Sequence, residues 1–293
     1  MSTIRNAPLR RWEARGRRLD VFGRGVFVVD EGDGVPIVIL HGYPSCSFDF
    51  HAALDHLTDS HRVVIHDHLG FGLSEKPTDY SYSLIEQADV AVGVWRTLGI
   101  ERAHLVAHDY GTSVATELLA RRERGLLEIE LSSVTLCNGS MHVELCEMRP
   151  IQHLLINRVS GPVVARLAFQ GLFHRQMRNL FGDPESVGGE ELDALWEALD
   201  RDDGRAVFHE VSRYQLERWK FWDRWIGALE RLDLPAHVVW GRRDPVAVAA
   251  IAEQLASEIA DVEVTWLDDL GHYPMMEDPG RFAQALIRGL RSG

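Results

Sequence analysis

Asp109 lies in a stretch whose residue types suit a sharp turn from a strand into a helix. Residues 103–106 predict a short buried strand, and residues 112–119 predict a helix directly behind it. Ala107 and Gly111 supply the small side chains that such a turn requires on either side of its central residue. The turn would lift the Asp109 carboxylate above the sheet edge, beside helix N–H groups that can stabilise an anion forming in a reaction. In the alternative interpretation, Asp109 only caps the helix.

Two further loops carry side chains that complete a catalytic set with Asp109. Asp244 follows a predicted strand at residues 236–240, and His272 follows the last predicted strand, at residues 262–267. Because the carboxyl ends of parallel strands meet at one edge of a sheet, we expect the three side chains close together. A nucleophile, an acid and a histidine, in this chain order, form the catalytic triad of α/β-hydrolases.

Each member of this set has rivals in the sequence. Asp244 precedes a proline and could be a turn residue, and an aspartate in the loop of His272 itself, such as Asp268, could bond the histidine instead. Asp244 is preferred because close neighbours in sequence rarely point at one another. Ser113 and Ser45 are alternative nucleophiles, but their positions predict a helix hydroxyl bonded to a carbonyl and a helix-entry residue.

The overall composition limits the classes of partner. The chain has 293 residues, of which 44 are acidic and 31 basic, so its net charge is −13. This charge repels nucleic acids and anionic membranes, and neither is an expected partner. The three cysteines follow no metal-binding or disulfide spacing, so we expect reduced thiols, a cytoplasmic protein and no metal. The arginine-rich first eighteen residues are interpreted as a leader into the first strand, since no apolar run resembles a signal sequence.

The apolar pattern predicts an α/β fold with an inserted helical segment. Strands are expected at residues 21–30, 35–40, 62–67, 103–106, 131–136, 236–240 and 262–267, and helices at 48–57, 83–98, 112–119, 223–232, 246–259 and 279–290. This alternation predicts a mostly parallel central sheet flanked by helices. Between residues 140 and 222 only helical periodicity is found. We therefore expect a core domain of residues 1–139 and 223–293 and a helical cap subdomain of residues 140–222.

Several motifs resemble those of the α/β-hydrolase family, in the branch of epoxide hydrolases and haloalkane dehalogenases. They are His41-Gly42-Tyr43-Pro44, Asp67-x-x-Gly70-x-Gly72-x-Ser74-x-x-Pro77, His108-Asp109-Tyr110-Gly111, Gly241-x-x-Asp244-Pro245 and Gly271-His272. Within this branch the chain looks closest to the mesoderm-specific transcript-like hydrolases. That likeness is carried by His108-Asp109-Tyr110-Gly111, Arg224-Trp225-Ile226-Gly227-Ala228-Leu229 and His272-Tyr273-Pro274-Met275-Met276-Glu277-Asp278-Pro279. The resemblance implies a core with a cap.

An aspartate at such a turn predicts displacement chemistry. Its carboxylate can attack an electrophilic carbon and form an alkyl ester of the enzyme. His272 would then deprotonate the water that attacks the ester carbonyl of Asp109, while Asp244 holds the imidazole. The backbone N–H groups of Tyr110 and Tyr43 are the expected oxyanion donors, with His41 from the same motif included in the anion site. No metal or organic cofactor is expected.

The leaving group is predicted from the resemblance. Epoxide hydrolases of this type protonate the epoxide oxygen with two cap tyrosines, and the run Arg213-Tyr214-Gln215-Leu216-Glu217-Arg218-Trp219 resembles the segment with one of them. Tyr214 is therefore the candidate acid, with packing between cap and core as the alternative. The first cap tyrosine has no evident match, and His153 and His209 are considered as helpers. Tyr110 and Tyr43 stand where dehalogenases carry a halide-binding Trp and Asn.

Aromatic and aliphatic side chains in the cap predict an apolar pocket. Phe169, Leu172 and Phe173 fall on one helical face, and Trp219 heads a second series with Trp222 and Trp225. Packing within the cap and against the core is the alternative for both series. We expect a small hydrophobic organic substrate, and epoxide hydrolysis to a diol as the leading function. Haloalkane dehalogenation is the second hypothesis, and a non-catalytic small-molecule binding protein on the same fold is the third.

Overall fold

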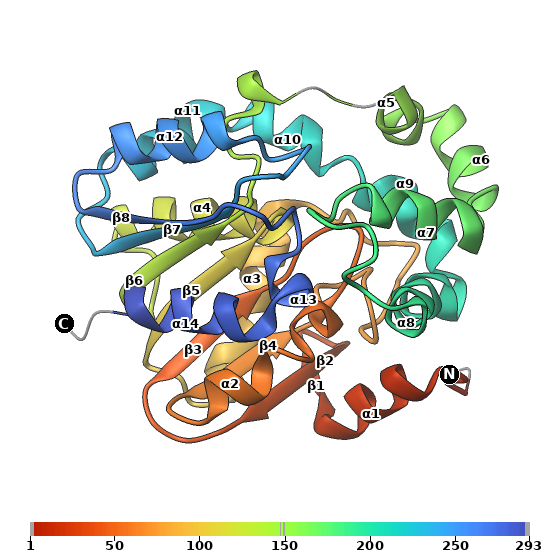
Figure 1. Ribbon diagram of the computed structural model, residues 1–293, viewed down its shortest axis with the longest axis horizontal. Coiled ribbons are helices and arrows are strands. Elements are labelled where there is room, and N and C mark those ends of the chain that lie inside the picture. The colour runs from red at the N-terminus through yellow and green to blue at the C-terminus, as the bar shows by residue number, and fades with distance from the viewer. Residues whose placement is uncertain (1–2, 147, 149, 291–293) are drawn as a thin grey trace.

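A central sheet of eight strands organises the molecule (Figure 1). The computed structural model describes residues 3–146, 148 and 150–290. The strands are β1 (Gly16–Val21), β2 (Arg24–Glu31), β3 (Pro36–Leu40), β4 (Arg62–His66), β5 (Arg102–His108), β6 (Glu130–Cys137), β7 (Ala236–Gly241) and β8 (Val262–Leu267). Their order across the sheet is β1-β2-β4-β3-β5-β6-β7-β8. The hairpin β1–β2 joins β4 in antiparallel pairing, and all other neighbours are parallel, as the sequence predicts.

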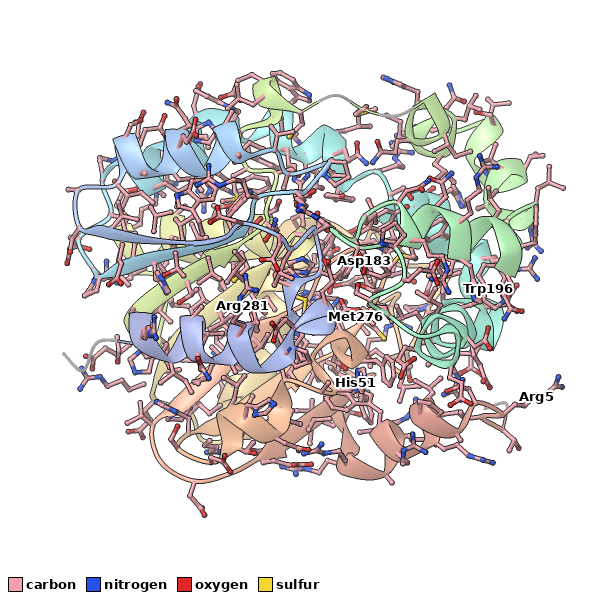
Figure 2. The ribbon with its side chains drawn as sticks, viewed as in Figure 1. Arg5, His51, Asp183, Trp196, Met276 and Arg281 are labelled. Carbon is pink, nitrogen blue, oxygen red and sulfur yellow. The ribbon has the colours of Figure 1, made fainter. Side chains whose placement is uncertain are left out.

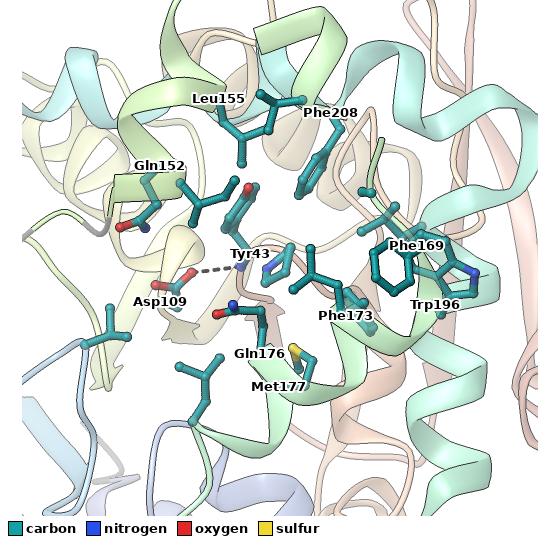
Figure 3. A pocket seen from close by; sticks show the side chains of 18 of the residues that line it. Tyr43, Asp109, Gln152, Leu155, Phe169, Phe173, Gln176, Met177, Trp196 and Phe208 are labelled. Carbon is teal, nitrogen blue, oxygen red and sulfur yellow. Dashed lines mark hydrogen bonds between the residues drawn. The ribbon is translucent and has the colours of Figure 1, made fainter. Parts of the chain in front are cut away.

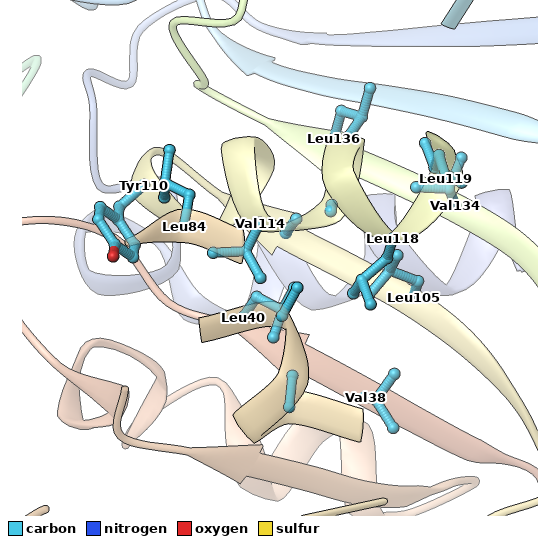
Figure 4. Packing of buried hydrophobic residues seen from close by; sticks show 14 of the residues in the cluster. Val38, Leu40, Leu84, Leu105, Tyr110, Val114, Leu118, Leu119, Val134 and Leu136 are labelled. Atoms are coloured by element: carbon cyan, nitrogen blue, oxygen red, sulfur yellow. The ribbon is translucent and has the colours of Figure 1, made fainter. Parts of the chain in front are cut away.

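Both faces of the sheet are covered, which is why its strands read as near-continuous apolar runs. Val38 and Leu40 of β3 point into one hydrophobic cluster, while Ile37 and Ile39 point into the other. The first cluster includes residues of α3 (Leu84–Thr97), α4 (Tyr110–Glu123), α11 (Trp222–Glu230) and α12 (Ala249–Glu258) (Figure 4). The second includes residues of η1 (Ser47–Phe50), α2 (Leu54–Thr58), α13 (Pro274–Glu277) and α14 (Pro279–Gly289).

Helices connect β6 to α11 and lie over the carboxyl edge of the parallel strands (Figure 1). They are η2 (Val143–Leu145), α5 (Pro150–Ile156), α6 (Ser160–Arg166), α7 (Gln170–Arg178), α8 (Gly189–Asp200), η3 (Arg201–Asp203), α9 (Gly204–Val211) and α10 (Tyr214–Lys220). No strand is assigned here among the described residues. Nowhere in the described part of the chain is a helix both long and apolar enough to cross a membrane.

The N-terminal segment differs from the expected leader, because it forms helix α1 (Ala7–Arg15). The Asn6 side chain accepts a hydrogen bond from the Leu9 amide at 2.8 Å and caps this helix. The amides of Arg5 and Asn6 donate to the Glu197 carboxylate of α8 at 2.6 and 2.7 Å, so the segment is fastened beside the Trp196 turn of α8 (Figure 2). The buried Trp12 donates to Ser47 Oγ at 3.0 Å. The cap and the start of the chain therefore support each other.

Glu117 joins the helix that follows Asp109 to the helix that follows the cap. Its carboxylate is 2% exposed and accepts hydrogen bonds from Arg224 at 2.8 and 2.9 Å and from the Trp225 indole at 2.9 Å. Arg121 of the same helix donates to it at 2.9 Å. Arg224 and Trp225 open the segment on which part of the family resemblance rests, so that motif has a structural role between α4 and α11.

We predict that Glu117→Ala lowers the free energy of unfolding by about 3 kcal/mol, because it leaves a buried cluster of donors without their acceptor. Chemical denaturation followed by tryptophan fluorescence measures this loss. Glu123→Ala is the matched control, since Glu123 also joins α4 to the α11 end, through Arg231, but at the surface. Its loss should be much smaller. If the two variants lose the same free energy of unfolding, burial is not what makes the Glu117 contacts important.

Candidate active site

Asp109 lies at a strained turn between β5 and α4. Its φ and ψ angles are 45° and −108°, outside the regions that most residues adopt. A Cβ atom at Gly111 would approach the Leu40 carbonyl oxygen to 2.2 Å, so only glycine fits where α4 crosses β3. A Cβ at Gly42 would come within 3.0 Å of Asp109 Cβ. These close approaches explain why small residues surround the turn and why Asp109 is held at the sheet edge.

The two carboxylate oxygens of Asp109 face different partners. Oδ1 accepts a hydrogen bond from the Tyr43 amide at 2.8 Å (Figure 3). Oδ2 lies 3.7 Å from Nε2 of His272. The Tyr110 amide is in the first turn of α4, where helix N–H groups have no partner within the helix. Of the two expected donors, the Tyr43 amide bonds the carboxylate, and the Tyr110 amide belongs to the residue next to it in the chain.

His272 and Asp244 come together although 28 residues separate them. Nδ1 of His272 bonds Oδ2 of Asp244 at 2.6 Å, whereas the rival Asp268 bonds Arg242 at the surface. Burial lowers the pKa of His272, but the charges of Asp244 and Asp109 and the hydrogen bond to Asp244 outweigh it and raise the pKa to about 9. With both carboxylates charged, His272 is therefore an imidazolium at neutral pH.

Asn138 holds Asp244 from the end of β6. Its Nδ2 donates to Asp244 Oδ2 at 2.7 Å, and its Oδ1 accepts from the Gly241 amide at 2.9 Å. The Val246 and Ala247 amides donate to the other oxygen, Oδ1, at 2.7 and 2.9 Å. These three hydrogen bonds to Asp244, together with the one to His272, fix the orientation of its carboxylate. The φ of Asn138 is 40°, so its backbone turns sharply at the end of β6.

His108 is a second positioning residue that sequence reasoning missed. Its Nε2 bonds the backbone oxygen of His272 at 2.7 Å, and the ring is fully buried. Burial, with a smaller effect of the charge of His272, lowers the pKa of His108 to about 3. The ring is therefore neutral, and Nε2 carries the proton that is donated. Tyr273 completes this support, because its hydroxyl donates to the Tyr43 carbonyl at 3.2 Å and so anchors the loop that bonds Asp109.

His41 does not take the place expected for it in the anion site. Its Nδ1 bonds the Gly42 carbonyl at 2.8 Å, and its Nε2 accepts from the His68 amide at 3.0 Å. Both ring nitrogens are therefore committed to the backbone of the two loops that follow β3 and β4. Burial also lowers the pKa of His41, which keeps the ring neutral. The residue fastens two loops together and contributes no donor to Asp109.

An apolar cavity of about 410 Å³ opens onto Asp109 and His272 (Figure 3). Of the four side chains expected in the pocket, Phe169, Leu172 and Phe173 line it. Trp219 does not, because it lies on the outer face of α10 and is 57% exposed. Its partners in the tryptophan series take the packing role, with Trp225 buried against Glu117 and Trp222 bonded to Glu144. The three tryptophans also do not share one helical face, because α10 ends at Lys220 and Trp222 begins α11.

Tyr214 lines this cavity, and its hydroxyl forms no hydrogen bond with another residue in the described part of the chain. Burial and the charge of Asp109 raise the pKa of Tyr214, while the Arg218 charge opposes the shift. The Arg218 guanidinium lies 4.5 Å from the Tyr214 ring centroid and donates from Nε to Ser113 Oγ at 2.7 Å. A buried cation thus lies against the face of the phenol.

The second tyrosine of the cavity is differently bonded. Tyr43 Oη lies 2.9 Å from Ser212 Oγ, whose own proton goes to the Phe208 carbonyl at 2.7 Å. Since Ser212 has one proton, Tyr43 must donate in this pair. Of the two tyrosine hydroxyls at the cavity, therefore, only that of Tyr214 keeps an uncommitted proton.

The remaining candidates lie away from the cavity. Ser113 bonds Arg218 rather than a helix carbonyl, and Ser45 donates to the buried Asp49 at 2.5 Å. Neither serine lines the pocket, and neither do His153 and His209. The Tyr110 side chain is fully buried in the core instead of facing the cavity. Among the described residues, no group of three or more His, Cys, Asp or Glu is arranged to hold a metal ion.

Comparison with known proteins identifies relatives over most of the chain. The family model described as the alpha/beta hydrolase fold matches residues 35–279. LipZ of Mycobacterium tuberculosis, named as a hydrolase, is 40% identical over 280 residues, covering 95% of this chain and 96% of LipZ. The human mesoderm-specific transcript homolog protein is 33% identical over 295 residues, covering 97% and 88%. The epoxide hydrolase CorEH has a similar fold, with a TM-score of 0.77, 16% identity and coverage of 93% and 97%.

We predict that Asp244→Asn lowers the pKa of His272 by more than about one unit, because burial then acts against a weaker opposing charge. Titration of the His272 ring followed by NMR measures the pKa. Asp268→Asn is the control, since it removes a carboxylate from the His272 loop without touching the ring. If Asp268→Asn lowers the pKa of His272 more than Asp244→Asn does, then Asp268 and not Asp244 is the partner of His272.

Proposed function

The chain belongs to the α/β-hydrolase family, and within that family we propose that it is an epoxide hydrolase whose nucleophile is Asp109. One observation carries the proposal: a carboxylate, not a hydroxyl, lies at the turn, between the Tyr43 amide and His272, in an apolar cavity that also holds the free phenol of Tyr214. A carboxylate displaces at carbon, and a phenol can supply the proton that an epoxide oxygen needs.

In the first step, a carboxylate oxygen of Asp109 attacks one carbon of the epoxide and the C–O bond of the ring breaks. The released oxygen takes the proton of Tyr214, so the product is a hydroxyalkyl ester of Asp109 and a phenolate at Tyr214. Arg218 stabilises this phenolate through its charge against the ring. The apolar walls exclude water from the carboxylate and thereby strengthen it as a nucleophile.

The second step follows from the charge lost in the first. Once Asp109 is an ester, it no longer raises the pKa of His272, so the imidazolium releases its proton more readily. Transfer of that proton to the Tyr214 phenolate restores the phenol and leaves His272 neutral. The neutral ring then takes a proton from the water whose oxygen bonds the ester carbonyl carbon. The amides of Tyr43 and Tyr110 hold the resulting oxyanion, which collapses to expel the diol alkoxide; the alkoxide takes the proton back from His272. Asp109 is left as a carboxylic acid and passes its proton to the neutral His272, which restores the carboxylate and the imidazolium.

A halide leaving group makes less use of this arrangement. Halide release needs no proton, so the uncommitted phenol of Tyr214 would have no task. The Tyr110 ring, at the position of the halide-binding Trp of dehalogenases, is packed in the core. Ring opening is therefore the reaction that we assign, with haloalkanes as the competing electrophiles in the first test.

We predict that His272→Gln accumulates the Asp109 ester, because the variant lacks the base for the second step. Intact-protein mass spectrometry after incubation with a panel of epoxides should show the mass of the whole epoxide added, and peptide mapping should locate it on Asp109. The double variant Asp109→Ala/His272→Gln should remain unmodified. A halogen-free alkyl adduct from a haloalkane panel, without an epoxide adduct, would instead establish dehalogenation. If neither panel gives an adduct, the displacement mechanism loses its support and a binding role becomes the better assignment.

We predict that Tyr214→Phe slows formation of the ester by about 10²- to 10⁴-fold, the usual range for loss of a general acid. Rapid-quench mass spectrometry of Tyr214→Phe/His272→Gln against His272→Gln isolates this step. Tyr80→Phe in the same background is the control, since Tyr80 lies outside the cavity. An unchanged rate for Tyr214→Phe would show that another group protonates the epoxide oxygen.

A further inference from the structure

Three helices that contribute to the cavity wall, α5, α6 and α7, have a charge unlike that of the whole chain. Residues 151–180, which include most of α5 and all of α6 and α7, contain four arginines and no aspartate or glutamate, although the net charge of the chain is −13. Arg158 and Arg175 are exposed and form no ion pair among the described residues, whereas Arg166 and Arg178 pair with the exposed Asp203 and Glu185. Residues 151–180 are therefore a positively charged segment of a protein whose net charge is negative.

The same segment exposes an unusual share of apolar surface. We define the α5–α7 patch as its exposed large hydrophobic side chains: Ile151, Leu154, Val159, Val163, Leu167, Phe169 and Leu172. Across the whole described chain thirteen such side chains are exposed, so more than half of them gather in this short stretch. Val159 and Leu167 are 84% and 71% exposed. Concentrations of this kind mark interaction surfaces, because isolated exposed apolar residues are the norm elsewhere.

The patch is continuous with the cavity that leads to Asp109. Ile151, Leu167, Phe169 and Leu172 belong to both, since each is at least one third exposed and each lines the cavity (Figure 3). The wall between the patch and the carboxylate is mostly apolar, with Gln152 and Gln176 as polar lining residues near Asp109 (Figure 3).

We propose that the α5–α7 patch docks on the surface of a lipid bilayer that contains anionic lipids, and that the substrate enters the cavity from that bilayer. Exposed apolar side chains inserted at the interface, flanked by arginines facing anionic headgroups, are the chemistry of peripheral membrane binding. The net charge predicts repulsion, but charges farther than about 8–10 Å are screened at physiological salt, so the local arginines decide. The acidic helix α8, which packs against α7, limits docking to the α5–α7 side.

The occupant of the patch, a bilayer, does not depend on the proposed reaction. The second part of the inference does rest on it, since it names the substrate class as epoxides that dissolve in membranes. The two parts need separate measurements.

Vesicle flotation measures the first part. We expect wild-type protein to bind vesicles of two parts phosphatidylcholine to one part phosphatidylglycerol, to bind pure phosphatidylcholine less, and to lose binding as salt is raised. Val159→Glu/Val163→Glu should reduce binding by about tenfold, because it replaces two exposed patch residues that do not line the cavity. The control Val35→Glu/Leu126→Glu makes the same charge change at two exposed residues elsewhere and should bind like the wild type.

Three results would overturn the docking surface. The first is that wild-type protein binds neither kind of vesicle. The second is that the patch variant and the control variant lose vesicle binding equally. The third is that the wild-type protein sediments as a dimer and only the patch variant sediments as a monomer. The last result would assign the patch to a second copy of the chain.

The second part is measured by hydrolysis of a long-chain epoxide dissolved in the vesicles and of a short water-soluble one. The patch variant should lose at least about fivefold on the first and keep its rate on the second. Equal rates on the vesicle-dissolved epoxide would overturn entry from the bilayer. If the protein binds vesicles but hydrolyses neither epoxide, the proposed function fails while the docking surface stands.

Discussion

The close packing around one strained residue is the constraint on which the site depends. Asp109 keeps its unusual φ and ψ because α4 crosses β3 at a distance that only Gly111 permits, and because the loop of Gly42 closes over it from the other side. Strain of this kind persists only where the surroundings fix it, and here both covering faces of the sheet and the Glu117 cluster do so. The same packing brings the Tyr43 amide to the carboxylate. The core is thus the reason that a single aspartate faces the cavity in one orientation.

The pKa of His272 depends on how many carboxylates lie around its ring. Burial alone would make this histidine a weak base, yet Asp244 and Asp109 together raise its pKa to about 9. Asp244 is held in place by Asn138 and two backbone amides. The charge of Asp109 is the variable one, because an ester would remove it. The proposed reaction therefore changes the acidity of His272 between the two steps. The buried His108 is neutral, so its hydrogen bond to the backbone of His272 supports that residue without adding charge.

The sequence predicts what depends on local pattern and chain order. All seven expected strand regions contain strands, and the loops after β5, β7 and β8 bring Asp109, Asp244 and His272 together, because parallel strands end at one edge. Side-chain direction was the weak point. Trp219 was expected in the pocket but faces outward, on a helix that ends before Trp222. His41 lies in the expected loop, but both of its ring nitrogens bond the backbone. Asn138 and Arg218 were not identified, because their importance arises from contacts with residues more than one hundred positions away.

The proposed catalytic residues and most of the cavity wall belong to different parts of the molecule. Asp109, Asp244 and His272 come from loops of the sheet, whose geometry is fixed by a buried core. The walls that a substrate would touch come mainly from α5, α6 and α7, helices that also leave much of their apolar surface exposed. Substitutions in those helices can therefore alter which molecules reach the carboxylate without altering its geometry. Tyr214 and Arg218 are the exception, because they belong to the cap yet contact the core through Tyr43 and Ser113. The proposed proton donor is thus fixed to the core while the rest of the cavity wall is free to vary, so the proposed displacement chemistry would serve substrates of different shape.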